Sequence, residues 1–292
     1  MRYDIKLKIE YRYEYPAAQS RHIIRMMPAE LEHEQRFIAG NITCTPQADE
    51  WASRKDFFDN NCIEAAFKKN HQNIVFSLKA RVERFLPHEI SNRVFPLSEL
   101  PTALSSIRTL DARSPLHFCA SSIRAPIENG TRSFARDLVT DDMSLIDVVS
   151  TIGNAIFQEF KYDPKATTVE TPMLEAFNGR HGVCQDFGHI MISCLRGIGI
   201  PAGYVSGFLR TRAQEGKPRL EGADAMHAWV CIWCGAENGW VEYDPTNGFF
   251  VGQDHIVIAR GRDYFDVAPV KGITRTSGGH KTKQSVDVIP ID

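Results

Sequence analysis

Alternating hydrophobic and polar residues open the chain. In residues 2–14, tyrosine, isoleucine and leucine occupy every second position, and charged residues fill the positions between them. A period of two residues predicts a half-buried β-strand, which Pro16 ends. Further β-like segments occur at 20–27, 35–44, 63–68 and 72–85. Several short strands with little helical pattern predict an antiparallel β-sandwich over residues 1–95.

A helical period replaces this alternation in the second half of the chain. Apolar residues recur at helical spacing over 144–160 and again over 184–198. Between them we expect a short helix near 172–178, and strands follow from residue 202 onward. Residues 96–135 contain only short helical segments punctuated by Pro, Ser and Gly. We therefore predict an α+β protein with three parts, namely a sandwich (1–95), a linker with short helices (96–135) and an α+β core (136–292).

One cysteine stands at the start of the second helical pattern. Cys184 follows the glycine-containing turn at 179–183, and no Ser, Thr, Asp or Asn occupies 181–183 to cap the helix. A helix N-terminus with uncapped N–H groups stabilises a thiolate and also an oxyanion formed beside it. A lone cysteine in an apolar helix is usually a core residue, and Cys194 fits that description. Cys184 instead lies at the exposed end, as a nucleophile would.

A histidine and an aspartate follow on two neighbouring predicted strands. His227 opens the strand at 227–234, and Asp244 ends the strand at 239–243. Cysteine, histidine and a carboxylate form a nucleophile, a general base and a group that orients the base. Whether the side chains of His227 and Asp244 lie on the same face of the sheet depends on the register of the two paired strands. A four-residue loop at 235–238 pairs Cys234 with Gly239 and brings Asp244 to the face of His227, whereas a five-residue loop does not. We predict the former, or a bulge of equal effect.

Composition narrows the classes of protein. The 292 residues carry a formal net charge of −2, which argues against nucleic acid as a main partner. No run of 18 apolar residues predicts a membrane span, and residues 1–15 do not read as a signal peptide. Seven cysteines at irregular spacing do not suggest a disulfide framework. We expect a cytoplasmic protein without cofactor or metal, and its oligomeric state stays open.

Two other constellations compete for the chemistry. Cys231 and Cys234 could form a redox or zinc pair, but residues three apart on a strand point to opposite faces, and the sequence has no second Cys pair. A metal site formed by Cys184, His189 and His227 is disfavoured because His189 is turned away from the thiol along the helix. Packing roles are the simpler interpretation for these residues.

The segments HGVCQDFGHIMISCLRGIGIPAGYVSGF, MHAWV, GWVEYDPTNG and ARGRDYFDVAPVKG closely resemble the bacterial transglutaminase-like proteins. The resemblance implies a papain-like core, with Cys184 as nucleophile, His227 as general base and Asp244 as orienting carboxylate. Apart from the resemblance, Gln185, Asp186, Tyr162 and Trp229 are candidates for supporting or oxyanion-binding roles. Many members of the family carry a small residue where this chain has Met226.

The function that we expect from this resemblance is thiol-dependent acyl transfer on an amide, most simply hydrolysis of a peptide or isopeptide bond. The substrate would be a peptide or a protein. Transfer to an amine acceptor is an alternative, and so is a binding or scaffold protein that retains the fold without turnover.

Overall fold

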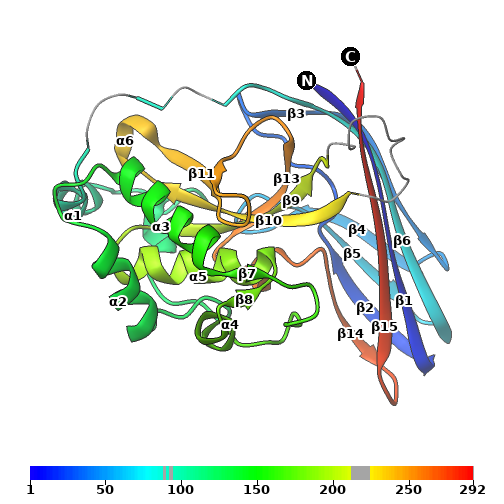
Figure 1. The fold of residues 1–292 in the computed structure, drawn as a ribbon. Helices are drawn as coiled ribbons and strands as arrows, with labels where there is room; N and C mark the ends of the chain where they lie inside the picture. The colour runs from blue at the N-terminus through cyan, green and yellow to red at the C-terminus, as the bar shows by residue number, and fades with distance from the viewer. Residues whose placement is uncertain (88–89, 92–94, 212–223, 292) are drawn as a thin grey trace, which may run out of the picture.

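A β-sandwich and an α+β core lie side by side in the computed structural model, which describes residues 1–87, 90–91, 95–211 and 224–291 (Figure 1). One sandwich sheet has the order β15-β1-β6-β3 and the other has the order β14-β2-β5-β4. The first contains β15 (His280–Ile291), β1 (Arg2–Ala17), β6 (His71–Arg84) and β3 (Gln35–Thr45). The second contains β14 (Val270–Arg275), β2 (Gln19–Ile24), β5 (Asn61–Phe67) and β4 (Glu50–Lys55). The alternation of β1 buries Tyr3, Ile5, Leu7 and Ile9.

The two C-terminal strands complete the sandwich, which corrects the predicted core of 136–292. Arg2 pairs with Ile291 and Val270 pairs with Ile24, so β15 and β14 extend sheets that the N-terminal strands begin. The physical reason is that β1 and β2 would otherwise leave edges with unpaired backbone groups. Strand β4 was also missed because all six of its residues are exposed, and it has no apolar alternation.

A five-stranded sheet of order β12-β11-β10-β9-β13 forms the centre of the core. Its strands are β9 (Ala202–Leu209), β10 (Ala225–Trp233), β11 (Trp240–Asp244), β12 (Phe249–Phe250) and β13 (His255–Gly261). The longer helices are α2 (Asn129–Leu138), α3 (Leu145–Glu159), α4 (Met173–Gly179) and α5 (Cys184–Gly197). The predicted helices at 144–160, 172–178 and 184–198 thus correspond to α3, α4 and α5.

Short elements connect this framework. They are η1 (Leu97–Glu99), α1 (Leu100–Ser105), η2 (Pro115–Phe118), β7 (Lys161–Tyr162), β8 (His181–Gly182), α6 (Gly235–Asn238) and α7 (Tyr264–Val267). Strands β7 and β8 pair in parallel and lead into the N-terminus of α5.

The two faces of β10 belong to different hydrophobic clusters. Val230 and Ile232 join the main core, which also contains the apolar residues of α5, whereas Trp229 and Cys231 join a smaller cluster with Val257. Cys234 belongs to the main core, so Cys231 and Cys234 pack in different clusters, as their spacing on a strand predicted. His227 is two residues before Trp229 and therefore shares its face of the strand.

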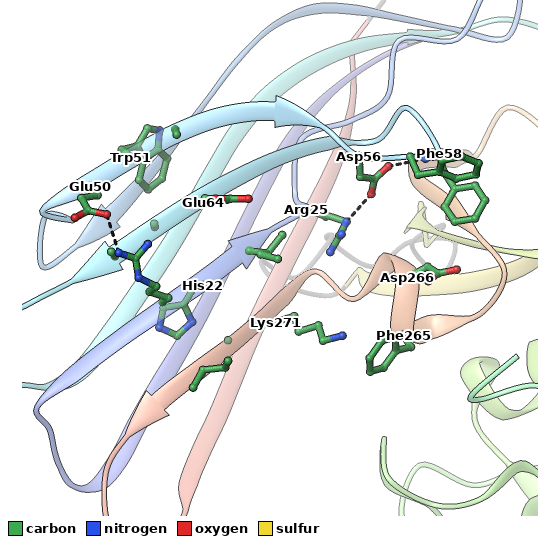
Figure 2. A pocket seen from close by; sticks show the side chains of 18 of the residues that line it. His22, Arg25, Glu50, Trp51, Asp56, Phe58, Glu64, Phe265, Asp266 and Lys271 are labelled. Carbon is green, nitrogen blue, oxygen red and sulfur yellow. Dashed lines mark hydrogen bonds and ion pairs between the residues drawn. The ribbon is translucent and has the colours of Figure 1, made fainter. Parts of the chain in front are cut away.

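A pocket of about 770 Å³ lies against the sheet β14-β2-β5-β4 where the sandwich meets α7 (Figure 2). It contains neither Cys184 nor His227 among its lining residues.

Candidate active site

Cys184 is the first residue of α5 and is half-buried. The side chain of the N-cap residue, Val183, accepts no hydrogen bond. Asp186 instead turns back, and its Oδ2 atom accepts the Val183 N–H at 2.9 Å and the Thr167 hydroxyl at 2.6 Å. Burial raises the pKa of Asp186. Asp186 therefore fixes the turn that carries the cysteine, while the first N–H groups of the helix have no side-chain cap.

Gly182 makes this turn possible. A Cβ atom at residue 182 would lie 2.7 Å from the Asp186 carboxylate, closer than unbonded atoms pack. The sequence shows only that this glycine lies in a turn. The structure shows that a glycine is needed here because the Asp186 side chain packs against its Cα atom.

The β10–β11 hairpin has the register that the sequence predicted. Val230 pairs with Tyr243 and Trp233 pairs with Trp240, and the Cys234 N–H donates to Gly239 at 2.8 Å. Positive φ angles at Gly235 (87°) and Gly239 (59°) allow the short loop between them. This register sets Asp244 across from Trp229, on the face that also holds His227. The prediction that Asp244 reaches His227 is confirmed, since Oδ2 lies 2.7 Å from Nε2.

Asp244 is completely buried and accepts five hydrogen bonds. Its Oδ2 atom accepts from Nε2 of His227, from Nε2 of His255 and from Nδ2 of Asn247, at 2.7, 3.0 and 2.7 Å. Its Oδ1 atom accepts from the backbone N–H groups of Thr246 and Asn247. Burial alone would raise the pKa of this carboxyl, but the hydrogen bonds to the two histidines outweigh it and hold the pKa well below its usual range. Asp244 is therefore a fixed anion.

His227 lies between this anion and the cysteine. Burial works to lower its pKa, but the side-chain hydrogen bonds to Asp244 and Cys184 outweigh burial and raise the pKa to about 10. The imidazole is therefore positively charged at neutral pH. The structure thus brings Cys184, His227 and Asp244 together from α5, β10 and β11.

His255 was missed by the sequence analysis. It opens β13, is 1% exposed, and its Nε2 atom lies 3.0 Å from the same oxygen of Asp244 that His227 contacts. Its Nδ1 atom is buried without a partner among the described residues. A histidine at the start of an apolar strand is the same local signal that pointed to His227, so the sequence did contain a hint of it.

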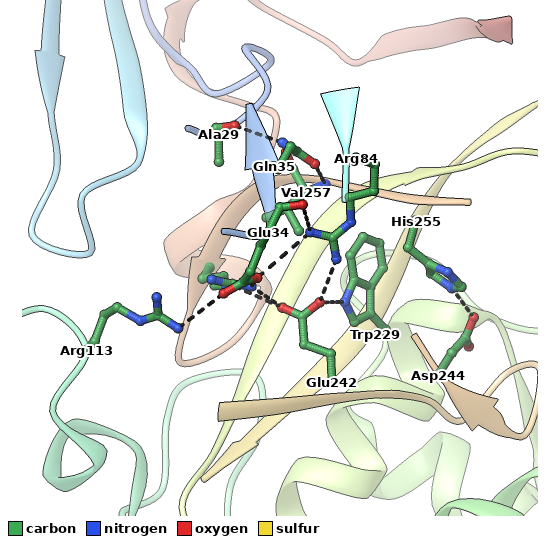
Figure 3. A network of polar contacts seen from close by, with 11 residues as sticks. Ala29, Glu34, Gln35, Arg84, Arg113, Trp229, Glu242, Asp244, His255 and Val257 are labelled. Atoms are coloured by element: carbon green, nitrogen blue, oxygen red, sulfur yellow. Dashed lines mark hydrogen bonds and ion pairs between the residues drawn. The ribbon is translucent and has the colours of Figure 1, made fainter. Parts of the chain in front are cut away.

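Trp229, a candidate for a supporting or an oxyanion-binding role, has an indole N–H that is already engaged. Its indole N–H donates to Glu242 at 2.9 Å, and Arg260 donates to the other oxygen of that carboxylate (Figure 3). The ring packs beside His227 and His255, with centroids 6.1 and 5.1 Å away. Trp229 therefore packs against both imidazole rings and restricts their orientation.

Residues of the sandwich form ion pairs with the residues that hold Trp229 in place. Glu34, which precedes β3, forms an ion pair with Arg260, and Arg84 at the end of β6 lies 3.9 Å from both Glu34 and Glu242. Arg113 of the linker reaches Glu34 as well. This network, seen in Figure 3, connects the N-terminal strands to the sheet face that carries the histidines.

Tyr162 and Gln185 lie near the cysteine without a fixed role. Tyr162 is 53% exposed on β7, and its pKa is raised by burial and by the nearby Cys184. Gln185 is the second residue of α5 and is half-buried. His189 lies deeper in the same helix, where its Nε2 atom accepts the Tyr264 N–H at 3.2 Å.

Among the described residues, His227, Asp244 and His255 form a group that could hold a metal ion, with ligand atoms within 4.8 Å of one another. Imidazole and carboxylate are ligands that Zn²⁺ accepts. The contacts of 2.7 and 3.0 Å are nevertheless hydrogen bonds to one oxygen that Asn247 shares. This geometry fits a proton-sharing network better than a coordination shell.

Comparisons with known proteins identify the family and the fold of the chain. The profile of the transglutaminase-like superfamily matches residues 132–245, and that of the bacterial transglutaminase-like N-terminal region matches residues 3–83. An uncharacterized protein of Mycobacterium tuberculosis (strain ATCC 25618 / H37Rv) is 31% identical over 304 residues, covering 100% of this chain and 93% of the relative. One from Mycobacterium leprae (strain TN) is 46% identical over 114 residues, or 38% of this chain and 39% of the relative.

A solved structure from Cytophaga hutchinsonii, named a "putative cysteine protease", has a TM-score of 0.78 and 19% identity to the chain. The alignment covers 100% of this chain and 91% of that one. At this identity the likeness concerns the fold, and it confirms the predicted papain-like α+β architecture.

Proposed function

Because the chain belongs to the transglutaminase-like superfamily, we propose that it catalyses thiol-dependent acyl transfer on amide bonds through Cys184, His227 and Asp244. The favoured reaction is hydrolysis of a peptide or isopeptide bond. The observation that carries this proposal is the position of His227, which contacts Cys184 and also donates to the buried Asp244 at 2.7 Å. A histidine held between a thiol and an anion is the arrangement that activates a nucleophile.

The proposed reaction begins with the charged His227 stabilising the Cys184 thiolate. The sulfur attacks the amide carbonyl carbon, a C–S bond forms, and the carbonyl π electrons move to oxygen. The uncapped N–H groups at the start of α5 stabilise that oxyanion. Collapse breaks the C–N bond, and His227 gives its proton to the departing amine. The product is a thioester on Cys184.

A second half-reaction releases the acyl group. His227, now neutral, takes a proton from water, and the oxygen attacks the thioester carbon. The C–S bond breaks, the carboxylic acid leaves, and Cys184 and His227 return to the ion pair. Asp244 keeps one imidazole orientation throughout and stays ionised. Tyr162 and Gln185 are candidates to touch the substrate carbonyl, because both lie beside Cys184.

The acceptor is the main open alternative. A primary amine in place of water would make the same thioester a transglutaminase intermediate. A scaffold that binds without turnover is a third reading, but the complete set of hydrogen bonds on Asp244 supports a site built for chemistry.

Cellular location stays a proposal as well. All seven cysteines are unpaired, which suits the reducing cytoplasm. Within the described residues, no helix is long and apolar enough to cross a membrane.

The test is incubation of the protein with a defined peptide library, with and without a small primary amine, followed by mass spectrometry. Hydrolysis predicts cleaved peptides in both samples, and transfer predicts amine adducts only in the second. The matched control is Cys184→Ala, which keeps the fold and removes the sulfur. Peptides that stay unchanged with the native protein, or products that persist with Cys184→Ala, would reject the proposal.

A further inference from the structure

The pocket against the sheet β14-β2-β5-β4 has the size of a ligand site. Its volume is about 770 Å³, and its walls come from all four strands and from the segment around α7 (Figure 2). Neighbouring strands lie about 4.8 Å apart, so four of them span roughly 14 Å, the length of about four extended residues. The pocket therefore has room for a short stretch of extended chain.

Large apolar side chains are exposed along this pocket. Trp51, Phe57, Phe265 and Ile273 line it and are between 40% and 84% exposed. In Figure 2, Trp51 lies at one end, and Phe265 and Phe58 lie at the other. Several large apolar side chains exposed within one pocket typically mark an interaction surface.

The charges of the pocket are paired with one exception. The internal pairs are Arg21 with Glu50, Arg25 with Asp56, and Arg262 with Asp266, at 3.1, 3.0 and 2.8 Å. Glu64, which also lines the pocket, pairs with Arg54.

Lys271 is the exception, because it forms no ion pair with any described residue. Its ammonium nitrogen lies 2.9 Å from the centroid of the Phe265 ring. Burial and, to a smaller degree, the neighbouring Arg25 lower the pKa of Lys271, and Asp266 and Asp263 oppose this effect without forming an ion pair with the ammonium group.

We infer that this pocket binds an extended peptide segment in which one carboxylate side chain lies between apolar residues. The carboxylate would contact Lys271, and the apolar residues would pack on Trp51, Phe57 and Phe265. The pocket lining carries four basic and four acidic side chains, and among them Lys271 is the one without an ion pair to a described residue, so the charge preference is for a single carboxylate at that position. The apolar walls favour a peptide over a small inorganic anion.

The position of the pocket relates it to the cysteine helix. Phe265 and Asp266 of α7 line the pocket, while the backbone of Tyr264, in the same turn, donates to His189 of α5. A segment held in the pocket would thus lie across α7 from the helix that carries Cys184. That the pocket recruits a substrate protein rests on the proposed function. The binding of a peptide in the pocket does not require catalysis.

Binding is therefore measured on full-length Cys184→Ala protein, so that no bond is cleaved. The probe is a fluorescein-labelled peptide, Phe-Leu-Glu-Phe-Leu, whose termini are blocked so that glutamate supplies its only carboxylate. The matched peptide has Gln in place of Glu. Fluorescence anisotropy gives the two dissociation constants, and emission changes lost in Trp51→Phe locate the site.

We expect the Glu peptide to bind roughly tenfold more tightly than the Gln peptide, the size of one charge-assisted contact. Lys271→Gln should remove this difference, and Lys281→Gln, an equal change on the exposed face of β15, should keep it. Equal binding of both peptides, no binding of either, or a difference that survives Lys271→Gln would overturn the inference. Because Cys184 is absent from every sample, a failed activity assay leaves these outcomes unaffected.

Discussion

His227 and Asp244 meet across the β10–β11 hairpin through a 2.7 Å hydrogen bond between Nε2 and Oδ2. The pairing of Val230 with Tyr243 makes this contact possible. A shift of one residue would turn Asp244 to the opposite face of the sheet and leave the histidine without its anion. The four-residue loop between Cys234 and Gly239 is thus as necessary for the site as the side chains themselves.

Asp244→Asn should reduce kcat/KM by roughly 10² to 10⁴ while the protein stays folded. The amide cannot balance a charged imidazole, and it can hold His227 in the wrong tautomer. Steady-state kinetics on a cleaved peptide measures the effect. Asp141→Asn, an exposed aspartate in an ion pair with Arg136, is the control and should leave the rate unchanged. Loss of less than about threefold at residue 244 would mean that the carboxylate has no part in the reaction.

Activity should persist to an alkaline limit near pH 10. Although burial opposes it, hydrogen bonding to Asp244 and Cys184 raises the pKa of His227 to about 10. The proton needed by the departing amine is thus present below that pH and lost above it. Because the pKa of His227 is higher in the folded than in the unfolded protein, its protonation stabilises the fold. This contribution to the free energy of unfolding is complete below the unfolded pKa of about 6.5 and is lost as the pH rises through the folded pKa. A kcat/KM profile that already falls near pH 6.5 would contradict these contacts.

His255→Leu should move the acid limb of the pH profile upward. The substitution removes a donor to the Asp244 carboxylate, so protonation of Asp244 becomes easier. His255→Gln keeps an N–H donor at the same place and should restore most of the native profile. Both variants lose the imidazole ring, but only His255→Gln keeps a donor to Asp244. A difference between them therefore reports the hydrogen bond to Asp244 rather than the packing of the ring. Identical acid limbs in the two variants would exclude a role through Asp244.

Glu242→Gln should destabilise the fold by about 1.5–3 kcal/mol, since the buried Arg260 and Arg84 lose one of their two carboxylate partners and keep only Glu34. Thermal unfolding measures the loss, and Trp229 fluorescence should change because its N–H partner is altered. Glu64→Gln is the control, since its ion pair with Arg54 is exposed. Equal unfolding temperatures for the two variants would show that the network does not join sandwich to core.

Local patterns predicted most of the fold, and non-local pairing accounts for what was missed. The alternation of β1 and the helical period of α3 and α5 are properties of single segments, so the sequence displays them. The pairing of Arg2 with Ile291 joins opposite ends of the chain, and no local pattern can reveal it. Strand β4 is exposed on every residue and lacks the alternation on which strand prediction depends.

In the candidate site, too, the contacts set by local sequence could be predicted, and those set by pairing between distant strands could not. Loop length sets the register of a hairpin, so the meeting of His227 and Asp244 could be predicted. His255 reaches Asp244 only because β13 pairs with β9, a contact that depends on the whole sheet. The hydrogen bond from the Trp229 N–H to Glu242, across the hairpin, could not be predicted either, because it too depends on how the strands pair.

The reactivity of Cys184 tests the central claim most directly. Native protein is treated briefly with iodoacetamide near pH 6, and peptide mapping gives the labelling rate of each of the seven cysteines. Cys184 should react fastest, because its sulfur lies at the N-terminus of α5 in contact with the positively charged His227, a setting that makes a cysteine nucleophilic. In His227→Ala this advantage should disappear. Labelling of Cys184 at or below the rate of the other cysteines in the native protein would contradict its role as the nucleophile.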